Sequence, residues 1–238
     1  MFHDIRSPGT FARHPLIGVS MLIAGSLVFG LLAYNLVTNG PLLAWDVPLA
    51  NSLHATALNS PRWVNGIMIA GYYVGDQLVA AIGVVLGIYF LRRRYWRELT
   101  MLANGFGVSA LIFLLLSHIF NRPRPVFESQ IWRLEPIPGF PSGHAIAVVA
   151  SYGLLVYFFV PKISSRAGRA LAIAGVLLVG LYVLFSRAFL GDHFLTDLVA
   201  GCAVGIAWSG LAHTVVERIF RKRTRVAATS RVGLAFPR

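Results

Sequence analysis

The stretch FPSGHAIAVVASYGLLVYFFV, residues 140–160, joins a polar loop directly to an apolar run. Its first part contains Ser142, Gly143 and His144, which are residue types that bind ligands or transfer protons. The rest, Ala145–Val160, carries no charged side chain and predicts a membrane-spanning helix. If this loop forms a site at a membrane surface, other polar residues should lie at the same end of neighbouring spans.

The composition of the chain is that of an integral membrane protein. Of its 238 residues, 56% are hydrophobic and 13% are charged, whereas about 25% are charged in a soluble domain. A bilayer-spanning helix needs about 20 apolar residues, and six runs approach this length, at residues 15–37, 67–91, 102–120, 145–160, 170–185 and 195–216. We therefore expect an all-α integral membrane protein with six transmembrane helices, of which the fourth and fifth look short and are expected to tilt or to end at the interface.

The Lys and Arg residues predict the orientation of the chain. Sixteen of the 21 lie before the first span, after the second, between the fourth and fifth, or after the sixth. By the positive-inside rule, both termini then face the cytoplasm. We interpret the net charge of +12 as a topology signal and an attraction to anionic lipid headgroups, rather than as nucleic-acid binding. The chain is expected to form one domain over residues 1–238 in the cell (inner) membrane, with a basic cytoplasmic tail at 217–238.

The outer ends of the spans collect the polar residues that remain. Arginine pairs bidentately with phosphate oxygens, and the N–H groups at the start of a helix favour an anion. Gly143 lets the backbone approach such an anion closely. These features predict a phosphate site at the periplasmic or extracellular surface, where a lipid headgroup is in reach while its tail stays in the bilayer. The residues on that side are Arg122, Arg124, Ser142, His144, Arg187, His193 and Asp197.

Three blocks of the sequence resemble those of a known family. They are NRPRP at residues 121–125, PSGH at 141–144 and SRAFLGDHFLTD at 186–197. Their order and spacing are similar to the K-x6-R-P, P-S-G-H and S-R-x5-H-x3-D pattern of the type-2 phosphatidic acid phosphatase family. The resemblance implies a six-helix membrane enzyme that removes phosphate from a lipid. The second and third blocks match in full, whereas Ser117 stands where the first block requires Lys.

The resemblance also implies a role for each residue in a metal-independent reaction. His193 attacks phosphorus to give a phosphohistidine, and Asp197, four residues on, shares a helical face with it and fixes its tautomer. His144 protonates the leaving oxygen and then activates water. Ser186 matches the third block without an assigned role. The groups expected to hold the phosphate oxygens are Arg124, Arg187, Ser142 and the Gly143 N–H.

Ser117 leaves one cation of the family pattern unaccounted for. Arg122, two residues from Arg124, is our favoured replacement, and a protonated His118 is an alternative. In a third possibility, the pocket works without this charge or needs the space. Asp192 adjoins His193 but is expected to point into solvent.

Three classes of function fit this sequence. The first is a lipid phosphatase on the outer face, with polyprenyl diphosphate or phosphatidylglycerol phosphate as the favoured substrate. The second is a lipid phosphotransferase that uses the same site, and the third, less favoured because the spans hold few ionisable groups, is a transporter or structural membrane protein. The expected partners are the lipid substrate and the bilayer; no nucleic acid is expected and no protein partner is indicated. No cofactor is expected, the alternative being a metal held by His144, Asp192, His193 and Asp197.

Overall fold

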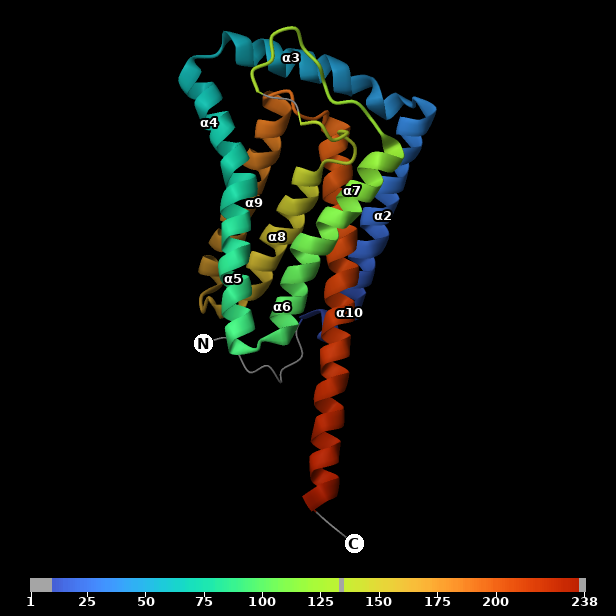
Figure 1. Ribbon diagram of the computed structural model, residues 1–238, viewed down its shortest axis with the longest axis vertical. Coiled ribbons are helices and arrows are strands. Elements are labelled where there is room, and N and C mark those ends of the chain that lie inside the picture. Colours follow the sequence, from blue (N-terminus) through green and yellow to red (C-terminus); the bar gives the residue numbers. More distant parts are fainter. Residues whose placement is uncertain (1–9, 133–134, 236–238) are drawn as a thin grey trace.

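The structure, a computed structural model, describes residues 10–132 and 135–235 (Figure 1). For Ala12, Asp76 and residues 223–235 it describes the backbone alone. Every regular element among the described residues is helical, which confirms the all-α fold. In chain order these elements are α1 (Thr10–Arg13), α2 (Pro15–Thr38), η1 (Pro41–Trp45), α3 (Asp46–Asn59), α4 (Arg62–Tyr73), η2 (Val74–Leu78), α5 (Val79–Arg93), α6 (Trp96–Ala103), η3 (Asn104–Val108), α7 (Ser109–Phe120), α8 (Gly143–Phe159), η4 (Val160–Lys162), α9 (Arg166–Phe189) and α10 (Leu195–Ala235).

Five helices of the described part are long and apolar enough to cross a membrane. They contain the first, third, fourth, fifth and sixth predicted spans. The second predicted span falls in α4, η2 and α5, which follow one another along one edge of the bundle in Figure 1. The membrane-protein class is confirmed, and a count of six spans stays a prediction. The five helices are Pro15–Thr38, Trp96–Phe120, Gly143–Lys162, Arg166–Phe189 and Leu195–Lys222.

The expectation of short fourth and fifth spans was wrong. The fifth, α9, has 24 residues and includes both Arg169 and Arg187. The predicted span, residues 170–185, excluded both arginines because they are charged. An arginine side chain can nevertheless stay within a helix when its guanidinium finds a polar partner. The fourth begins at Gly143, because Ser142 caps the helix, and continues through η4 for 20 residues.

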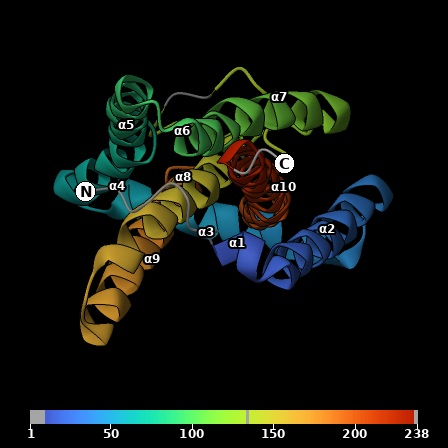
Figure 2. The ribbon, with the colours of Figure 1, turned by 90° about the horizontal axis from the view of Figure 1, so that it is seen from below.

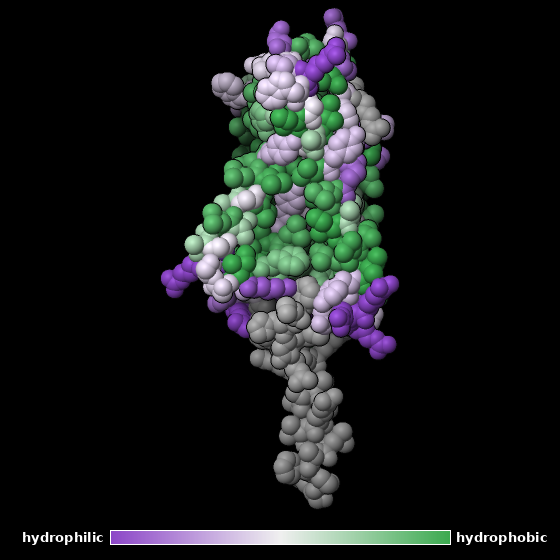
Figure 3. Space-filling view, turned by 90° about the vertical axis from the view of Figure 1, so that its left-hand side faces the viewer, coloured by the Kyte–Doolittle hydropathy of each residue, from purple (hydrophilic) through white to green (hydrophobic). Residues whose placement is uncertain are grey.

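An apolar belt lies across the middle of the molecule on the face formed by α5 and α9. On the face formed by α5 and α9, Figure 3 shows hydrophobic side chains between two hydrophilic ends. Val84 and Val85 of α5 and Leu178 and Leu181 of α9 are between 62% and 67% exposed. Side chains of this kind are stable in such numbers on a surface that faces lipid rather than water.

Helix α10 lies at the centre of the bundle, between α2, α6 and α8 (Figure 2). Small residues allow this close packing, as is common between membrane helices. A Cβ atom at Gly25 of α2 would lie 2.9 Å from the Cβ of Ala207. At Gly201 of α10, a Cβ would lie 2.4 Å from the carbonyl oxygen of Ser142, so this glycine admits the loop that precedes α8.

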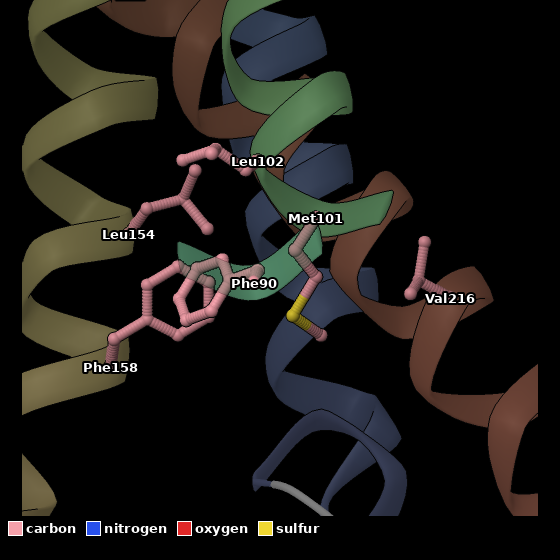
Figure 4. Packing of buried hydrophobic residues seen from close by; sticks show 6 residues of the cluster. All are labelled: Phe90, Met101, Leu102, Leu154, Phe158 and Val216. Atoms are coloured by element: carbon pink, nitrogen blue, oxygen red, sulfur yellow. The ribbon is translucent and has the colours of Figure 1, made fainter. Parts of the chain in front are cut away.

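The end of the bundle that holds α6 has a hydrophobic core of its own. Figure 4 shows this cluster, which joins α5, α6, α8 and α10. The cluster packs these four helices together at this end of the bundle. Its buried members are Phe90, Met101, Leu102, Leu154, Phe158 and Val216.

The predicted basic tail, residues 217–238, does not begin as a separate segment. Glu217 is 2% exposed and accepts a hydrogen bond from the Tyr157 hydroxyl, so the bundle still includes it. The α10 helix then continues through Ala235 and projects beyond the other helices (Figure 1). Residues 236–238 and the side chains from 223 onward lie outside the described part, as do Arg6 and Arg133 of the charge count.

The opposite end of the bundle is capped by α3 and by the connection from α7 to α8. In Figure 1, α3 lies across this end, at a steep angle to the long helices. Ala57 of α3 is fully buried against Phe189 and Leu190 at the end of α9. The caps therefore cover the ends of the helices that carry the three sequence blocks.

Candidate active site

The three blocks meet at the end of the bundle that α3 caps. NRPRP follows the end of α7, PSGH begins α8, and SRAFLGDHFLTD joins the end of α9 to the start of α10. A backbone hydrogen bond of 2.9 Å from Ser142 N to Asp197 O ties the second block to the third. Residues far apart in the sequence thus lie close together at this end of the bundle.

A glycine-ended turn places His193 beside α9. Gly191 has φ of +75°, a left-handed conformation that favours glycine. The Asp192 N–H bonds to the carbonyl of Arg187 at 2.9 Å, and the Gly191 N–H to that of Ala188 at 3.1 Å. This is the Schellman arrangement that ends many helices. It turns the chain back, so that His193 lies next to the last turn of α9.

The sequence led us to expect His193 and Asp197 on one helix, but the two residues do not share one. His193 precedes α10, which begins at Leu195, whereas Asp197 lies in the first helical turn. Asp197 Oδ2 accepts a 3.0 Å hydrogen bond from Phe194 N, as the side chain at position N3 of a capping box does. The pair still meets: His193 Nδ1 and Asp197 Oδ2 are 3.7 Å apart.

The His193 imidazole is buried and presents one nitrogen to cationic or proton-bearing groups. Its Nε2 lies 3.2 Å from Arg124 Nη1 and 3.2 Å from His144 Nδ1. A guanidinium can only donate, so Nε2 carries the lone pair and Nδ1, which faces Asp197, carries the proton. Burial lowers the pKa of His193 well below its ordinary value of 6.5, and the charge of Asp192 only partly opposes this. The ring is therefore neutral at physiological pH, with Nε2 free to act as a nucleophile.

Two arginines converge near this nitrogen. Arg124 is held by a 2.8 Å bond from Nε to the Ile137 carbonyl. Arg187 is fully buried, with its guanidinium carbon 4.2 Å from the centre of the Tyr72 ring and Nη2 3.3 Å from the Tyr72 carbonyl. Backbone and ring contacts fix both guanidiniums before any anion enters, which lowers the cost of organising them around one.

Asp192 lies inside this cluster, and the expectation that it points into solvent was wrong. It is 3% exposed, and Oδ1 lies 2.5 Å from Arg124 Nη1. Its Oδ2 lies 3.8 Å from both Arg187 Nη1 and His144 Nδ1, and 3.9 Å from His193 Nε2. The signal that could have revealed it is its position directly after the helix-ending Gly191. The carboxylate occupies the place where the cations converge, so an entering phosphate competes with it.

Three of these groups have the geometry of metal ligands. His144 Nδ1, His193 Nε2 and a carboxylate oxygen of Asp192 lie within 4.8 Å of one another. Imidazole and carboxylate donors are those that Zn²⁺ takes. The set differs from the predicted alternative, because Asp197 is paired with Arg122. The guanidiniums of Arg124 and Arg187 next to Asp192 raise the electrostatic cost of placing a divalent cation there.

The start of α8 supplies the backbone donors. Ser142 is fully buried, and its Oγ accepts a 3.3 Å hydrogen bond from Ala145 N as the N-cap. Gly143 is the first helical residue, where N–H groups have no partner within the helix. A Cβ atom at Gly143 would lie 2.9 Å from the Phe113 ring. A glycine at this position therefore allows the first turn of α8 to pack against α7.

A cavity of about 350 Å³ extends from the site. Tyr72, Arg124, Glu135 and His144 line its polar part. The remaining wall comes mainly from α5, η3, α7 and α8. These lining residues include Val79, Ala80, Phe106, Ala110, Phe113, Ile146 and Ala147.

Comparison with known proteins identifies the family. The sequence model of the PAP2 superfamily matches residues 98–221, which include all three blocks. The chain is also 32% identical to phosphatidylglycerophosphatase B of Bacillus subtilis over 206 residues, which cover 84% of this chain and 96% of that one. The chain belongs to the PAP2 superfamily.

Two further proteins are similar to this chain. The crystal structure of a transmembrane PAP2 type phosphatidylglycerolphosphate phosphatase from Bacillus subtilis superposes with a TM-score of 0.71 at 26% identity, covering 85% of this chain and 97% of that one. Lipid phosphate phosphatase delta of Arabidopsis thaliana is 34% identical over 87 residues, which are 34% of this chain and 20% of that protein. The chain is thus a multi-pass membrane enzyme that hydrolyses lipid phosphate monoesters, as the resemblance implied.

This PAP2 chain departs from the family pattern at Ser117, and Arg122 does not fill the gap. Arg122 Nη2 lies 2.8 Å from Asp46 Oδ2, and Nη1 lies 2.5 Å from Asp197 Oδ1, so two carboxylates hold it outside the cavity lining. Ser117 is buried and donates to the Leu114 carbonyl. His118 Nδ1 lies 2.7 Å from the same carbonyl on an exposed side chain. The geometry favours a pocket that works without a cation at position 117.

Ser186 serves packing in this PAP2 site. It is fully buried, and its Oγ donates to the Val183 carbonyl at 2.7 Å. A Cβ atom at Gly71 of α4 would lie 2.6 Å from this oxygen. The missing side chain of Gly71 therefore allows α4 to approach α9 at Ser186, and the neighbouring Tyr72 ring contacts Arg187.

Proposed function

We propose that this PAP2 enzyme removes the terminal phosphate of phosphatidylglycerol phosphate, at the outer face of the cell membrane, through a phosphohistidine on His193. The observation that carries the proposal is the position of His193 Nε2, 3.2 Å from both Arg124 and His144 in the cluster at the polar end of the cavity. The name of the relative with 32% identity, phosphatidylglycerophosphatase B, supports this substrate over polyprenyl diphosphate.

In the first step, Nε2 of His193 attacks phosphorus while the bond to the lipid oxygen breaks. His144 gives a proton to that oxygen, so that a neutral alcohol leaves. Arg124 and Arg187 neutralise the negative charge spread over the equatorial oxygens. Phosphorylation makes the imidazole cationic, and its Nδ1–H is then attracted to Asp197, 3.7 Å away before reaction.

In the second step, water replaces the lipid alcohol. His144, now without its proton, takes a proton from the water as the oxygen attacks phosphorus and the bond to Nε2 breaks. Inorganic phosphate leaves, and Asp192 can return to the guanidiniums of Arg124 and Arg187. A phosphotransferase would differ only in using an alcohol in place of water, which the same residues would activate.

The cavity supports a lipid as the substrate. Its polar part holds His144 and Arg124, and the rest is lined by apolar residues such as Phe106, Ala110 and Ala147. A substrate anchored by an acyl chain keeps its apolar part out of water while its phosphate reaches His193. The headgroup and tail of a phospholipid match this division.

Phosphate release from a panel of lipids tests the proposal. Purified enzyme in detergent, with EDTA present, is expected to act at least about ten-fold faster on phosphatidylglycerol phosphate than on phosphatidate or a polyprenyl diphosphate; such a ratio corresponds to about 1.4 kcal/mol in the transition state. Loss of activity in EDTA with recovery in Mg²⁺ would refute the metal-independent reaction. Phosphorylated glycerol as the main product, when glycerol is added, would identify a phosphotransferase.

The orientation is part of the proposal, with both termini in the cytoplasm and the site outside. Its support is the 16 to 5 division of the Lys and Arg residues. In a Cys202→Ala background, Ser129→Cys on the α7–α8 connection should react with an impermeant thiol reagent on intact cells, and Ser164→Cys should react only after lysis. Ser164 is chosen because Ser165 caps α9 through a 3.0 Å bond from Gly168 N. The reverse pattern of labelling would overturn the orientation.

A further inference from the structure

A buried aspartate outside the three blocks reaches the site from α3. Asp46, the first residue of α3, is 1% exposed. Its Oδ1 accepts a 3.0 Å hydrogen bond from Thr196 N in the first turn of α10, where the helix dipole favours an anion. Its Oδ2 accepts from the Thr196 hydroxyl and, at 2.8 Å, from Arg122 Nη2.

Arg122, which contacts Asp46, also contacts Asp197. Its Nη1 donates to Asp197 Oδ1 at 2.5 Å and to Thr196 Oγ1 at 2.8 Å. The guanidinium carbon lies 4.5 Å from the centre of the Phe194 ring, which covers it. Two carboxylates that are each at most 1% exposed therefore share one cation, and without it both would be costly to bury.

The two oxygens of Asp197 have separate tasks. Oδ1 is held by Arg122, and Oδ2 faces Phe194 N at 3.0 Å and His193 Nδ1 at 3.7 Å. Rotation of this carboxylate would move Oδ2 away from the histidine, and the Arg122 contact opposes that rotation. Because Arg122 is itself held by Asp46, the start of α3 sets the orientation of the group that faces the nucleophile.

We infer that Asp46 is a positioning residue for the phosphatase reaction, acting through Arg122 and Asp197 on the His193 ring. This inference rests on the proposed function, in which the phosphorylated imidazole is stabilised by Asp197. Asp46 does not line the cavity, so it has no route to the lipid except through this chain of contacts. Its effect should therefore appear in kcat rather than in KM.

Asp46→Asn keeps the shape of the side chain and removes its charge. We expect kcat for the lipid to fall about ten- to a hundred-fold, the range for a displaced catalytic contact, while KM stays within about two-fold because substrate contacts are intact. Glu128→Gln, which removes an exposed carboxylate from the α7–α8 connection, is the matched control and should leave both constants unchanged. A kcat within two-fold of wild type for Asp46→Asn would show that Asp46 only anchors α3.

A double-mutant cycle separates positioning from a general loss of stability. In an Asp197→Asn background, Asp46→Asn should lower kcat by less than about three-fold, because the group that it positions is already disabled. If the double variant instead loses kcat by the product of the two single losses, the two residues act independently and the inference is overturned. If Asp46→Asn does not fold, Thr196→Val, which removes the hydroxyl shared by Asp46 and Arg122, should lower kcat in the same way, and an unchanged kcat there would overturn it.

Measurements of the phosphoenzyme distinguish a failure of the inference on Asp46 from a failure of the proposed function. If His193 forms a phosphoenzyme in the wild type, but Asp46→Asn forms and hydrolyses it at wild-type rates, the inference on Asp46 alone fails. If no phosphoenzyme forms on His193 at all, the proposed function fails, and with it the basis of this inference.

Discussion

Replacing His193 with alanine should lower phosphate release from the lipid by about 10⁴-fold or more, the scale of loss when a covalent nucleophile is removed. The physical reason is the position of Nε2, which carries the lone pair and lies 3.2 Å from both Arg124 Nη1 and His144 Nδ1. The neighbouring arginines cannot take its place because they have no lone pair, and His144 is needed as the acid. The rate is measured as inorganic phosphate released from phosphatidylglycerol phosphate in detergent.

The control for this prediction is another histidine of the same chain. His118 is exposed on α7 and lies outside the cavity lining, so His118→Ala should keep the wild-type rate. Rapid quenching of the wild type with phosphorus-labelled lipid should trap a phosphate that is stable in alkali and lost in acid, as expected of a phosphohistidine. An active His193→Ala enzyme, or a labelled wild type whose phosphate lies on another residue, would rule out the mechanism.

Replacing His144 with asparagine should lower lipid turnover by about 10²- to 10⁴-fold, the usual contribution of a general acid and base. Its Nδ1 lies 3.2 Å from His193 Nε2, beside the atom that bonds to phosphorus. From there it can reach both the leaving oxygen and the incoming water. The loss should therefore depend on the leaving group.

A nitrophenyl phosphate tests this dependence, because nitrophenolate leaves without a proton. With this substrate, His144→Asn should release nitrophenolate in a burst and then stall, since the attacking water still lacks its base. His193→Ala is the control and should give no burst. Equal losses on the lipid and on the nitrophenyl ester, with no burst, would show that His144 has only a structural role.

Much of the fold and site follows from local features of the sequence. Long apolar runs must be helices that cross the bilayer, because backbone polar groups find no water there. Ser142 before an apolar run predicts a helix start, and Gly191 marks the end of α9. The positions of His144, Arg187 and His193 at the ends of apolar runs are enough to predict that they share one membrane face. These conclusions need only neighbours along the chain.

Other features depend on contacts between distant segments, and here the sequence predictions failed or were silent. Asp192 looked solvated, yet it lies between Arg124 and Arg187. Arg122 looked like a phosphate ligand, yet its partners are Asp46 and Asp197. A charged side chain carries no mark of its partner in the local pattern.

Hydropathy and capping act between near neighbours, so the amino-acid sequence alone dictates that the helices cross a membrane, about where they begin and end, and which ends carry the three sequence blocks. The pairing of the charges at those ends follows only from the packed molecule. A buried ion is tolerable only beside its counter-ion, and α3, the α7–α8 connection and the start of α10 bring Asp46, Arg122 and Asp197 together from distant positions. Packing therefore makes Arg122 part of an internal ion pair rather than a substrate ligand.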